Sequence, residues 1–401
     1  MKRLITLLLA LITALSALTA CGEDKSEEAT EAATSAPTEQ STVVSDDTRE
    51  KIKEQFEKAL DNHTFRGAVY VVYKGEEVYS GGTGKANKKE NTDNGADVVY
   101  HIASITKQFT AAAILQLCEQ GKMSLDDTLG KYYPEYEIGA DITIHNLLSM
   151  QSGIPDFARN YDEDGYEMTE VYQAVIDGVS EQNSIEENRA ALREWILSQD
   201  LLFEQGERFS YCNSNYFLLG EIIEMVSGKS YFDYLQTAFF EPLGMETTGF
   251  MENYDNPKAT VAKGYYGSSN ADEIFNAQGV AFACGDMMAS PKDMYQWSIA
   301  LHGGKVLGEE MYQKMIAPHA EGDENYSSYG YGLMISPDGL LKTYFHSGSI
   351  PCFLSCVLYA PDVDLYVAVM SNYADASMMT VTEEFVKIIL QELGLLIGQN
   401  L

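Results

Sequence analysis

The sequence predicts an α/β protein of the α+β kind, with one antiparallel sheet built from both chain ends, flanking helices, and a large, mainly helical inserted region. Two strand-like runs lie near the N-terminus, at Gly67–Tyr73 and 76–79, and three more lie at 341–345, 353–359 and 364–370. Within each group, turn-forming residues separate the strands. Between the two groups, the spacing of apolar residues is mostly helical. No internal repeat is visible.

Each end of this fold also carries a predicted helix. The helix at 49–60 repeats Ile52, Phe56 and Leu60 on one face. The final helix is expected to begin with a capping box of Thr380 and Glu383. Its apolar face comprises Phe385, Ile388, Ile389 and Leu393.

The composition argues against nucleic-acid binding and predicts a large hydrophobic core. The 401 residues include 27 Lys and Arg against 60 Asp and Glu, which gives a formal charge of −33. Such an acidic chain is a poor partner for nucleic acid, whose binding depends on basic residues. Hydrophobic residues make up 45% of the chain, enough for a large core in one domain or two interleaved ones.

The first 48 residues read as targeting and tether segments. Lys2 and Arg3 precede an apolar run at 4–18, and the run closes with Leu-Thr-Ala before Cys21. This resembles the lipobox of bacterial lipoproteins, which implies a signal peptide at 1–20 and lipidation of Cys21; ordinary signal cleavage is the alternative. Residues 21–48 are acidic and nearly free of large apolar side chains, so we expect a disordered tether. The folded domain is then expected at 49–396, extracytoplasmic and lipid-anchored to the cell membrane.

The remaining cysteines give no metal or disulfide framework. Five follow Cys21, and an odd number cannot all pair. Cys352 and Cys356 lie four apart in a predicted strand, too far for a bridge. No C-x-x-C or zinc-like Cys/His spacing is present, so these residues are expected to be buried, neutral side chains.

A first chemical motif lies where a strong helix begins. Ser104 and Lys107 are three residues apart, so their side chains share one helical face. A serine hydroxyl becomes a useful nucleophile when a base takes its proton, and a lysine one turn away can do so. The free N–H groups at the helix start suit an oxyanion.

Two further motifs follow in the chain. Tyr211 and Asn213 stand just before an amphipathic helix, and a tyrosine needs nearby cations before it can accept a proton. The segment from His346 through Ser347 and Gly348 to Ser349 lies at the end of a predicted strand.

In this order, Ser-x-x-Lys, Tyr-x-Asn and His-x-Gly resemble serine β-lactamases of class C, low-molecular-weight penicillin-binding proteins and their esterase relatives. Two supporting segments also match the family: 147–156 resembles its "LLxHxSGxPD" stretch, and 203–209 its "FxPGxxF". The resemblance covers residues 49 to 395 and implies a β-lactamase/transpeptidase-like fold.

The resemblance also implies roles. Ser104 attacks a carbonyl and forms an acyl-enzyme, while Lys107 and Tyr211 share the proton transfers, with the base left open. Asn213 binds the substrate amide, and the backbone N–H groups of Ser104 and Ser349 form the oxyanion hole. Residues 346 to 349 line the substrate site. No metal or organic cofactor is implied.

Departures from the family pattern bear on the substrate. His346 stands where efficient β-lactamases usually carry lysine, and histidine is mostly neutral at pH 7. We therefore expect a hydrolase of a D-amino-acid peptide, amide or small ester. The alternatives are a penicillin-binding sensor or cell-wall protein that turns over slowly, and a β-lactamase. The acidic stretch at 160–188 is either a solvated insertion or a substrate-shaping lid; oligomeric state is left open.

Overall fold

The structure is a computed structural model that describes residues 43–161, 167–170, 178–266, 269–270, 278–322, 326–336, 341–374 and 378–395. Residues 1–42, with the expected signal peptide, Cys21 and most of the tether, lie outside this part. So do 162–166 and 171–177 of the acidic 160–188 stretch. Val43 onward forms one compact unit.

The main sheet joins the two ends of this unit, as the sequence predicted. In the described residues it has eight strands in the order β13-β14-β15-β16-β17-β18-β1-β2. Their bounds are Ala320–Glu321, Ser328–Tyr329, Met334–Ser336, Thr343–Ile350, Phe353–Ala360, Leu365–Ser371, Gly67–Tyr73 and Glu76–Thr83. All neighbours are antiparallel, and β1 pairs with β18 from Gly67↔Ser371 to Tyr73↔Leu365.

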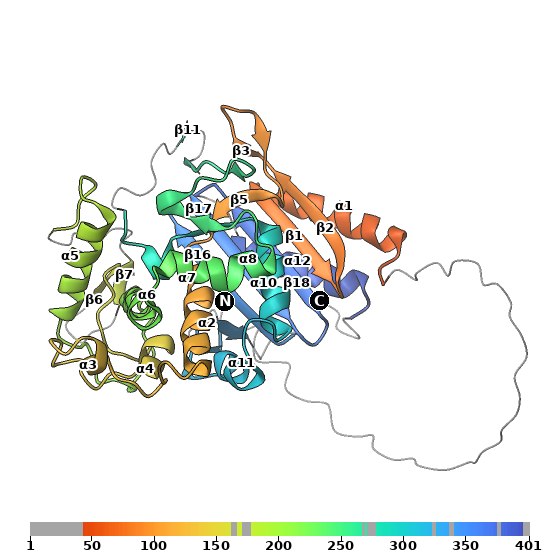
Figure 1. Ribbon diagram of the computed structural model, residues 1–401. Helices are drawn as coiled ribbons and strands as arrows, with labels where there is room; N and C mark the ends of the chain where they lie inside the picture. Colours follow the sequence, from red (N-terminus) through yellow and green to blue (C-terminus); the bar gives the residue numbers. More distant parts are fainter. Residues whose placement is uncertain are drawn as a thin grey trace, which may run out of the picture. The chain divides into compact units, whose positions relative to one another are not determined.

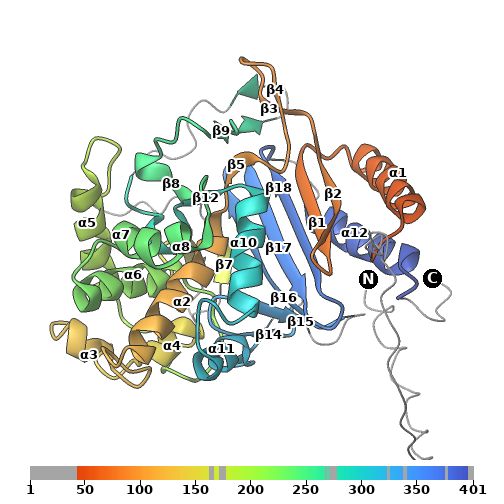
Figure 2. The same ribbon diagram turned by 45° about the vertical axis from the view of Figure 1, so that its right-hand side comes forward.

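Helices cover both faces of this sheet (Figures 1 and 2). The two terminal helices, α1 (Asp46–Asn62) and α12 (Met378–Glu392), pack together on one face, where the ring centroids of Phe56 and Phe385 are 4.2 Å apart. On the other face, α10 (Pro291–His302) packs on β1 and β18. Because every residue of β1 is buried, its sequence is a continuous apolar run rather than an alternating one.

The region between β2 and β13 is mainly helical, which agrees with the predicted insertion. Its helices are α2 (Thr106–Glu119), α3 (Leu129–Tyr132), α4 (Ile144–Leu148), α5 (Ile185–Leu197), α6 (Asn213–Ser227), α7 (Tyr231–Leu235), α8 (Glu241–Leu243), α9 (Phe282–Gly285), α10 and α11 (Glu309–Ile316). Short helical turns lie at η1 (Ala103–Ile105), η2 (Gln236–Phe240) and η3 (Met251–Asn253).

Short strands complete this region. A small sheet has the order β8-β12-β5-β9, with bounds Gly249–Phe250, Met287–Ala289, Val98–His101 and Thr260–Val261. Among the described residues, two-stranded antiparallel sheets pair β3 (Lys85–Asn87) with β4 (Thr92–Asp93), β6 (Arg159–Tyr161) with β7 (Glu167–Glu170), and β10 (Tyr265–Tyr266) with β11 (Ser269–Asn270).

Three boundaries differ from the sequence prediction. Helix α1 begins at Asp46, because Ser45 caps it by accepting from the Thr48 backbone N–H at 3.2 Å. The last residues assigned to the tether are therefore helical. Helix α12 already includes Thr380, so the predicted capping box does not start it. Strand β16 continues through the third motif to Ile350 rather than ending before it.

Within the described ranges, no helix is long and apolar enough to span a membrane.

Candidate active site

The first motif lies where a strand of the small sheet passes into a buried helix. Strand β5 leads into the tight turn η1, and α2 follows directly from it. Ala103 has a φ of +47°, in a region that residues other than glycine seldom adopt. Ser104 is half-buried at this turn, so the structure confirms its predicted place at the start of the helix.

Lys107 lies one turn further on and is completely buried. Its Nζ donates to Ser104 Oγ at 3.0 Å, to Asn213 Oδ1 at 2.8 Å and to the Cys284 carbonyl at 2.8 Å. Burial lowers the pKa of Lys107 to about 8. Near neutral pH this lysine can therefore both hold and release a proton next to the serine hydroxyl.

Asn213 joins the lysine to a buried carboxylate. It is the first residue of α6, and its Nδ2 donates to Asp156 Oδ2 at 2.9 Å. Burial raises the pKa of Asp156, while the Arg159 guanidinium, with Nε at 3.2 Å from Oδ2, opposes that shift. The Asn213 amide is held at both ends, which fixes its orientation.

Tyr211 stands beside two cations, as the sequence predicted for a catalytic tyrosine. Its ring centroid lies 4.9 Å from Lys107 Nζ and 5.2 Å from Arg159 Cζ. Burial nevertheless raises the pKa of Tyr211, although a hydrogen bond with Ser104 and the charge of Arg159 act against the rise. The phenol is thus protonated at neutral pH, and Lys107 is the better resting base.

The third motif lies in the middle of β16, next to the turn that carries the serine. A Cβ on Gly348 would be 2.1 Å from the Ile102 carbonyl oxygen, so only glycine allows this approach. Ser347 is half-buried and Ser349 is exposed. The motif therefore borders the nucleophile from a strand that the C-terminal half supplies.

His346, the first residue of this motif, was expected from the sequence to be mostly neutral at pH 7. The side chain is fully buried, and burial lowers its pKa to about 3. Its Nε2 lies 3.3 Å from the Tyr329 hydroxyl and its Nδ1 lies 2.6 Å from the Ser347 carbonyl. His346 is therefore a neutral side chain, because burial removes the water that would stabilise the charged imidazolium.

Sequence reasoning left three groups of this site without a role. Asp156 lies in the 147–156 segment that resembled the family. Its separation from Asn213 in the sequence gave no sign that the two side chains are in contact. Arg159 lies three residues after Asp156, just before the acidic 160–188 stretch. The Cys284 carbonyl carries no side-chain signal at all.

Four of the five described cysteines are buried, as expected from the sequence, whereas Cys118 is only partly buried. All five described cysteines are free, and burial raises the pKa of the Cys212 and Cys284 thiols. In the part of the chain that the structure describes, no group of three or more His, Cys, Asp or Glu could hold a metal ion.

Comparison with known proteins agrees with this geometry. The family model described as Beta-lactamase matches residues 52–390. PbpX of Bacillus subtilis (strain 168), which carries the name of a penicillin-binding protein, is 28% identical over 348 residues, or 83% of this chain and 79% of PbpX.

Solved structures are similar over most of the chain as well. The octameric penicillin-binding protein homologue from Pyrococcus abyssi is 28% identical with a TM-score of 0.70, covering 85% of this chain and 77% of that one. D-amino acid amidase from Ochrobactrum anthropi SV3, complexed with L-phenylalanine, is 25% identical with a TM-score of 0.71, covering 86% and 98%. With its family match, its sheet and its serine–lysine pair, the chain belongs to the Beta-lactamase family and is a serine hydrolase of that family.

Proposed function

We propose that this hydrolase forms an acyl-enzyme on Ser104 and acts on a D-amino-acid peptide, a D-amino-acid amide or a small ester. The observation that carries the proposal is the Lys107 ammonium, which lies 3.0 Å from the Ser104 hydroxyl and is held there by two other segments, through Asn213 Oδ1 and the Cys284 carbonyl. The names of similar proteins support the substrate range, because they include penicillin-binding proteins and a D-amino acid amidase.

The reaction follows from the positions of these groups. Ser104 Oγ attacks the substrate carbonyl carbon while Lys107 takes the hydroxyl proton. The backbone N–H groups of Ser104 and Ser349 stabilise the oxyanion, and Asn213 binds the amide beside it. Protonated Tyr211 or Lys107 gives a proton to the departing amine or alcohol. Water then attacks the ester, releases the acid and restores the serine.

Intact-mass measurement tests this function directly. The chain and its Ser104→Ala variant are incubated separately with a penicillin and with p-nitrophenyl acetate. Turnover that the variant loses supports the hydrolase, whereas a lasting adduct that the variant loses supports the slow sensor. Rapid penicillin hydrolysis would instead support a β-lactamase, which neutral His346 disfavours. No reaction with any acyl donor would overturn the proposal.

We also propose that Cys21 carries a lipid and holds the enzyme outside the cytoplasm. The basic start, the apolar run and the cysteine position support this localisation. Detergent phase partitioning of the full chain and of Cys21→Ser, expressed in a bacterial host, tests it. Recovery of both proteins in the aqueous phase would overturn the lipid anchor.

A further inference from the structure

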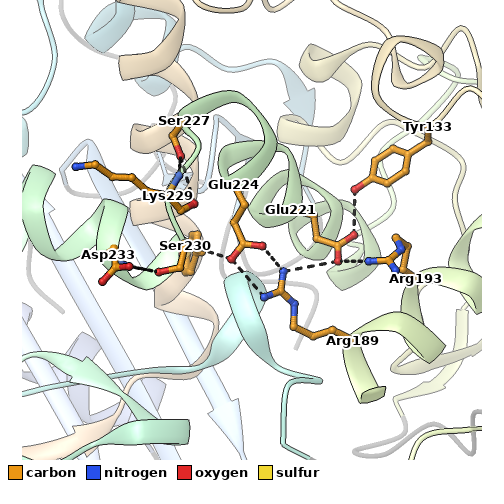
Figure 3. A network of polar contacts seen from close by, with 10 residues as sticks. Tyr133, Arg189, Arg193, Glu221, Glu224, Ser227, Lys229, Ser230 and Asp233 are labelled. Atoms are coloured by element: carbon orange, nitrogen blue, oxygen red, sulfur yellow. Dashed lines mark hydrogen bonds and ion pairs between the residues drawn. The ribbon is translucent and has the colours of Figure 1, made fainter. Parts of the chain in front are cut away.

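Arg189 on α5 lies in a network of charged side chains that joins α5 to α6 (Figure 3). Its Nη2 is 2.6 Å from Glu224 Oε2 and 3.6 Å from Glu221 Oε1, and its Nη1 donates to Glu224 Oε1 at 3.3 Å. Glu224 also accepts from the Tyr231 backbone N–H at 2.9 Å. The Arg189 side chain is only 17% exposed, so the network fixes its guanidinium in one place.

This guanidinium lies over the ring of Phe282, the first residue of α9. Arg189 Cζ is 3.6 Å from the Phe282 ring centroid, close enough for a stacked cation–π contact. Phe282 has a φ of +30°, a conformation that a bulky residue adopts only when its surroundings impose it. The rings of Phe217 and Tyr231, with centroids at 5.5 Å and 5.1 Å, hold its other sides.

Helix α6 approaches the same turn very closely. A Cβ on Gly220 would lie 2.3 Å from the Ala283 Cβ and 2.6 Å from the Phe282 ring, so this glycine allows the turn to sit against the helix. Helix α5 contacts this turn as well, because Arg189 lies over the Phe282 ring and the neighbouring Asn188 Nδ2 donates to the Gln278 carbonyl at 2.8 Å. The turn is therefore held between α5 and α6.

The two carbonyls after Phe282 point at α2. The Ala283 carbonyl accepts from Thr110 Oγ1 at 2.7 Å, and the Cys284 carbonyl accepts from Lys107 Nζ at 2.8 Å. Besides Ser104 Oγ itself, the Cys284 carbonyl is one of two acceptors that orient the Lys107 amine toward Ser104, and Asn213 Oδ1 is the other. A change in the Phe282 backbone moves this acceptor and with it the amine.

We propose that Arg189 is a positioning residue for acylation, acting through the Phe282 ring and the Cys284 carbonyl on Lys107. The inference rests on the proposed function, since it assigns Arg189 a part in that reaction. Arg189 touches neither substrate nor nucleophile. Its contribution is to hold a backbone carbonyl in the place where Lys107 needs it, and small displacements of such groups are costly to rate.

The experiment compares Arg189→Lys with Arg193→Lys in the full chain. Both changes keep a positive charge on α5 beside Glu221, and Arg193 Nη1 lies 2.8 Å from Glu221 Oε1. Lysine cannot supply the planar group that stacks on Phe282. We expect Arg189→Lys to lower kcat/KM for p-nitrophenyl acetate by about tenfold, mainly through the acylation rate. Arg193→Lys should change it by less than about twofold.

A double-mutant cycle with Phe282→Leu separates this role from a general loss of stability. If Arg189 acts through the ring, adding Arg189→Lys to the Phe282→Leu variant should lower kcat/KM by less than about a further twofold. Arg193→Lys should have the same small effect on kcat/KM in the wild-type chain and in Phe282→Leu. If Phe282→Leu does not fold, Glu224→Gln replaces it, because it loosens the anchor of the guanidinium. With this variant too, the effect of Arg189→Lys should shrink in the double mutant.

Equal effects of the two arginine variants, or multiplicative effects in the cycle, would overturn the role of Arg189 and leave the hydrolase intact. A wild-type chain that accepts no acyl group would overturn the hydrolase and the positioning role together.

Discussion

Lys107 Nζ lies 3.0 Å from Ser104 Oγ, and no part of the lysine side chain reaches solvent. The pair combines a nucleophile at a helix start with an amine whose charge the protein interior disfavours. This relationship decides the pH at which the site should work.

We expect kcat/KM to rise with pH through one ionisation near pH 8 and then to level off. Burial lowers the pKa of Lys107 to about 8, and only the neutral amine can take the Ser104 proton. Lys107→Arg should reduce acylation by about 10³-fold, because a guanidinium stays protonated. Stopped-flow release of p-nitrophenol measures both, with exposed Lys122→Ala as the control. A rate limb near pH 10, or a normal rate in Lys107→Arg, would remove lysine as the base.

Asp156→Asn should move this rate limb to lower pH, by about half a pH unit or more. Burial and the Arg159 charge lower the pKa of Lys107, whereas the Asp156 charge raises it, so losing the carboxylate removes a charge that opposes the lowering. The same pH–rate measurement checks the direction. Asp141→Asn, at an exposed position, is the matched control and should leave the apparent pKa of the pH–rate profile unchanged. A higher apparent pKa in Asp156→Asn would contradict the electrostatic account.

Gly348→Ala should destabilise the chain by about 1–3 kcal/mol, because overpacking a close backbone contact forces neighbouring atoms to move. The new Cβ would be 2.1 Å from the Ile102 carbonyl and 2.4 Å from Ser355 Oγ. Acylation should fall as well, since Ile102 lies two residues before Ser104. Urea denaturation and ester hydrolysis measure the two effects. A Cβ at Gly95 would have no atom within 4 Å, so the control Gly95→Ala should change neither stability nor ester hydrolysis appreciably.

The free energy of unfolding should decrease as pH rises from about 4.5 to about 7. Burial raises the pKa of Glu252 to about 7, and it raises the pKa of Asp286, where the charge of Glu252 adds to the shift. A carboxyl with a higher pKa in the folded chain binds more protons there, so its contribution is present at low pH and lost across this window.

Glu252→Gln should flatten that dependence and raise the melting temperature at pH 8 by about 2–4 °C. Exposed Glu246→Gln serves as the control, and thermal melts at pH 5 and pH 8 give the comparison. A wild-type chain that is equally stable at both values, or a variant that melts lower at pH 8, would contradict the assignment.

Much of the fold was predictable because its signals are local. Strand β1 shows a continuous apolar run, Lys74 and Gly75 mark the turn to β2, and Ser104 and Lys107 share a face through their spacing alone. The order of the three motifs also pointed to one site, and the structure brings Lys107, Asn213 and Tyr211 together.

Other features depend on contacts that no spacing encodes. The Cys284 carbonyl is a backbone group, so nothing in its side chain announces that it accepts from Lys107. His346 was expected to be mostly neutral from its ordinary pKa, but its full burial, which lowers that pKa further, depends on strands and aromatic rings from elsewhere in the chain. Ser45 caps α1 inside a stretch whose composition resembles a disordered tether. The helix begins there because its cap is a local hydrogen bond, which the average composition of the stretch does not reveal.

The pairing of β1 with β18 has a consequence for how the chain is made. Residue 67 cannot meet its partner at 371 until nearly the whole polypeptide has been synthesised. A nascent chain therefore carries the apolar β1 strand with one unpaired edge for most of translation, and long-range closure of this kind is slow. Premature stop codons before residue 365 should yield aggregates rather than a smaller folded protein, because they remove the strand that separates β1 from β17.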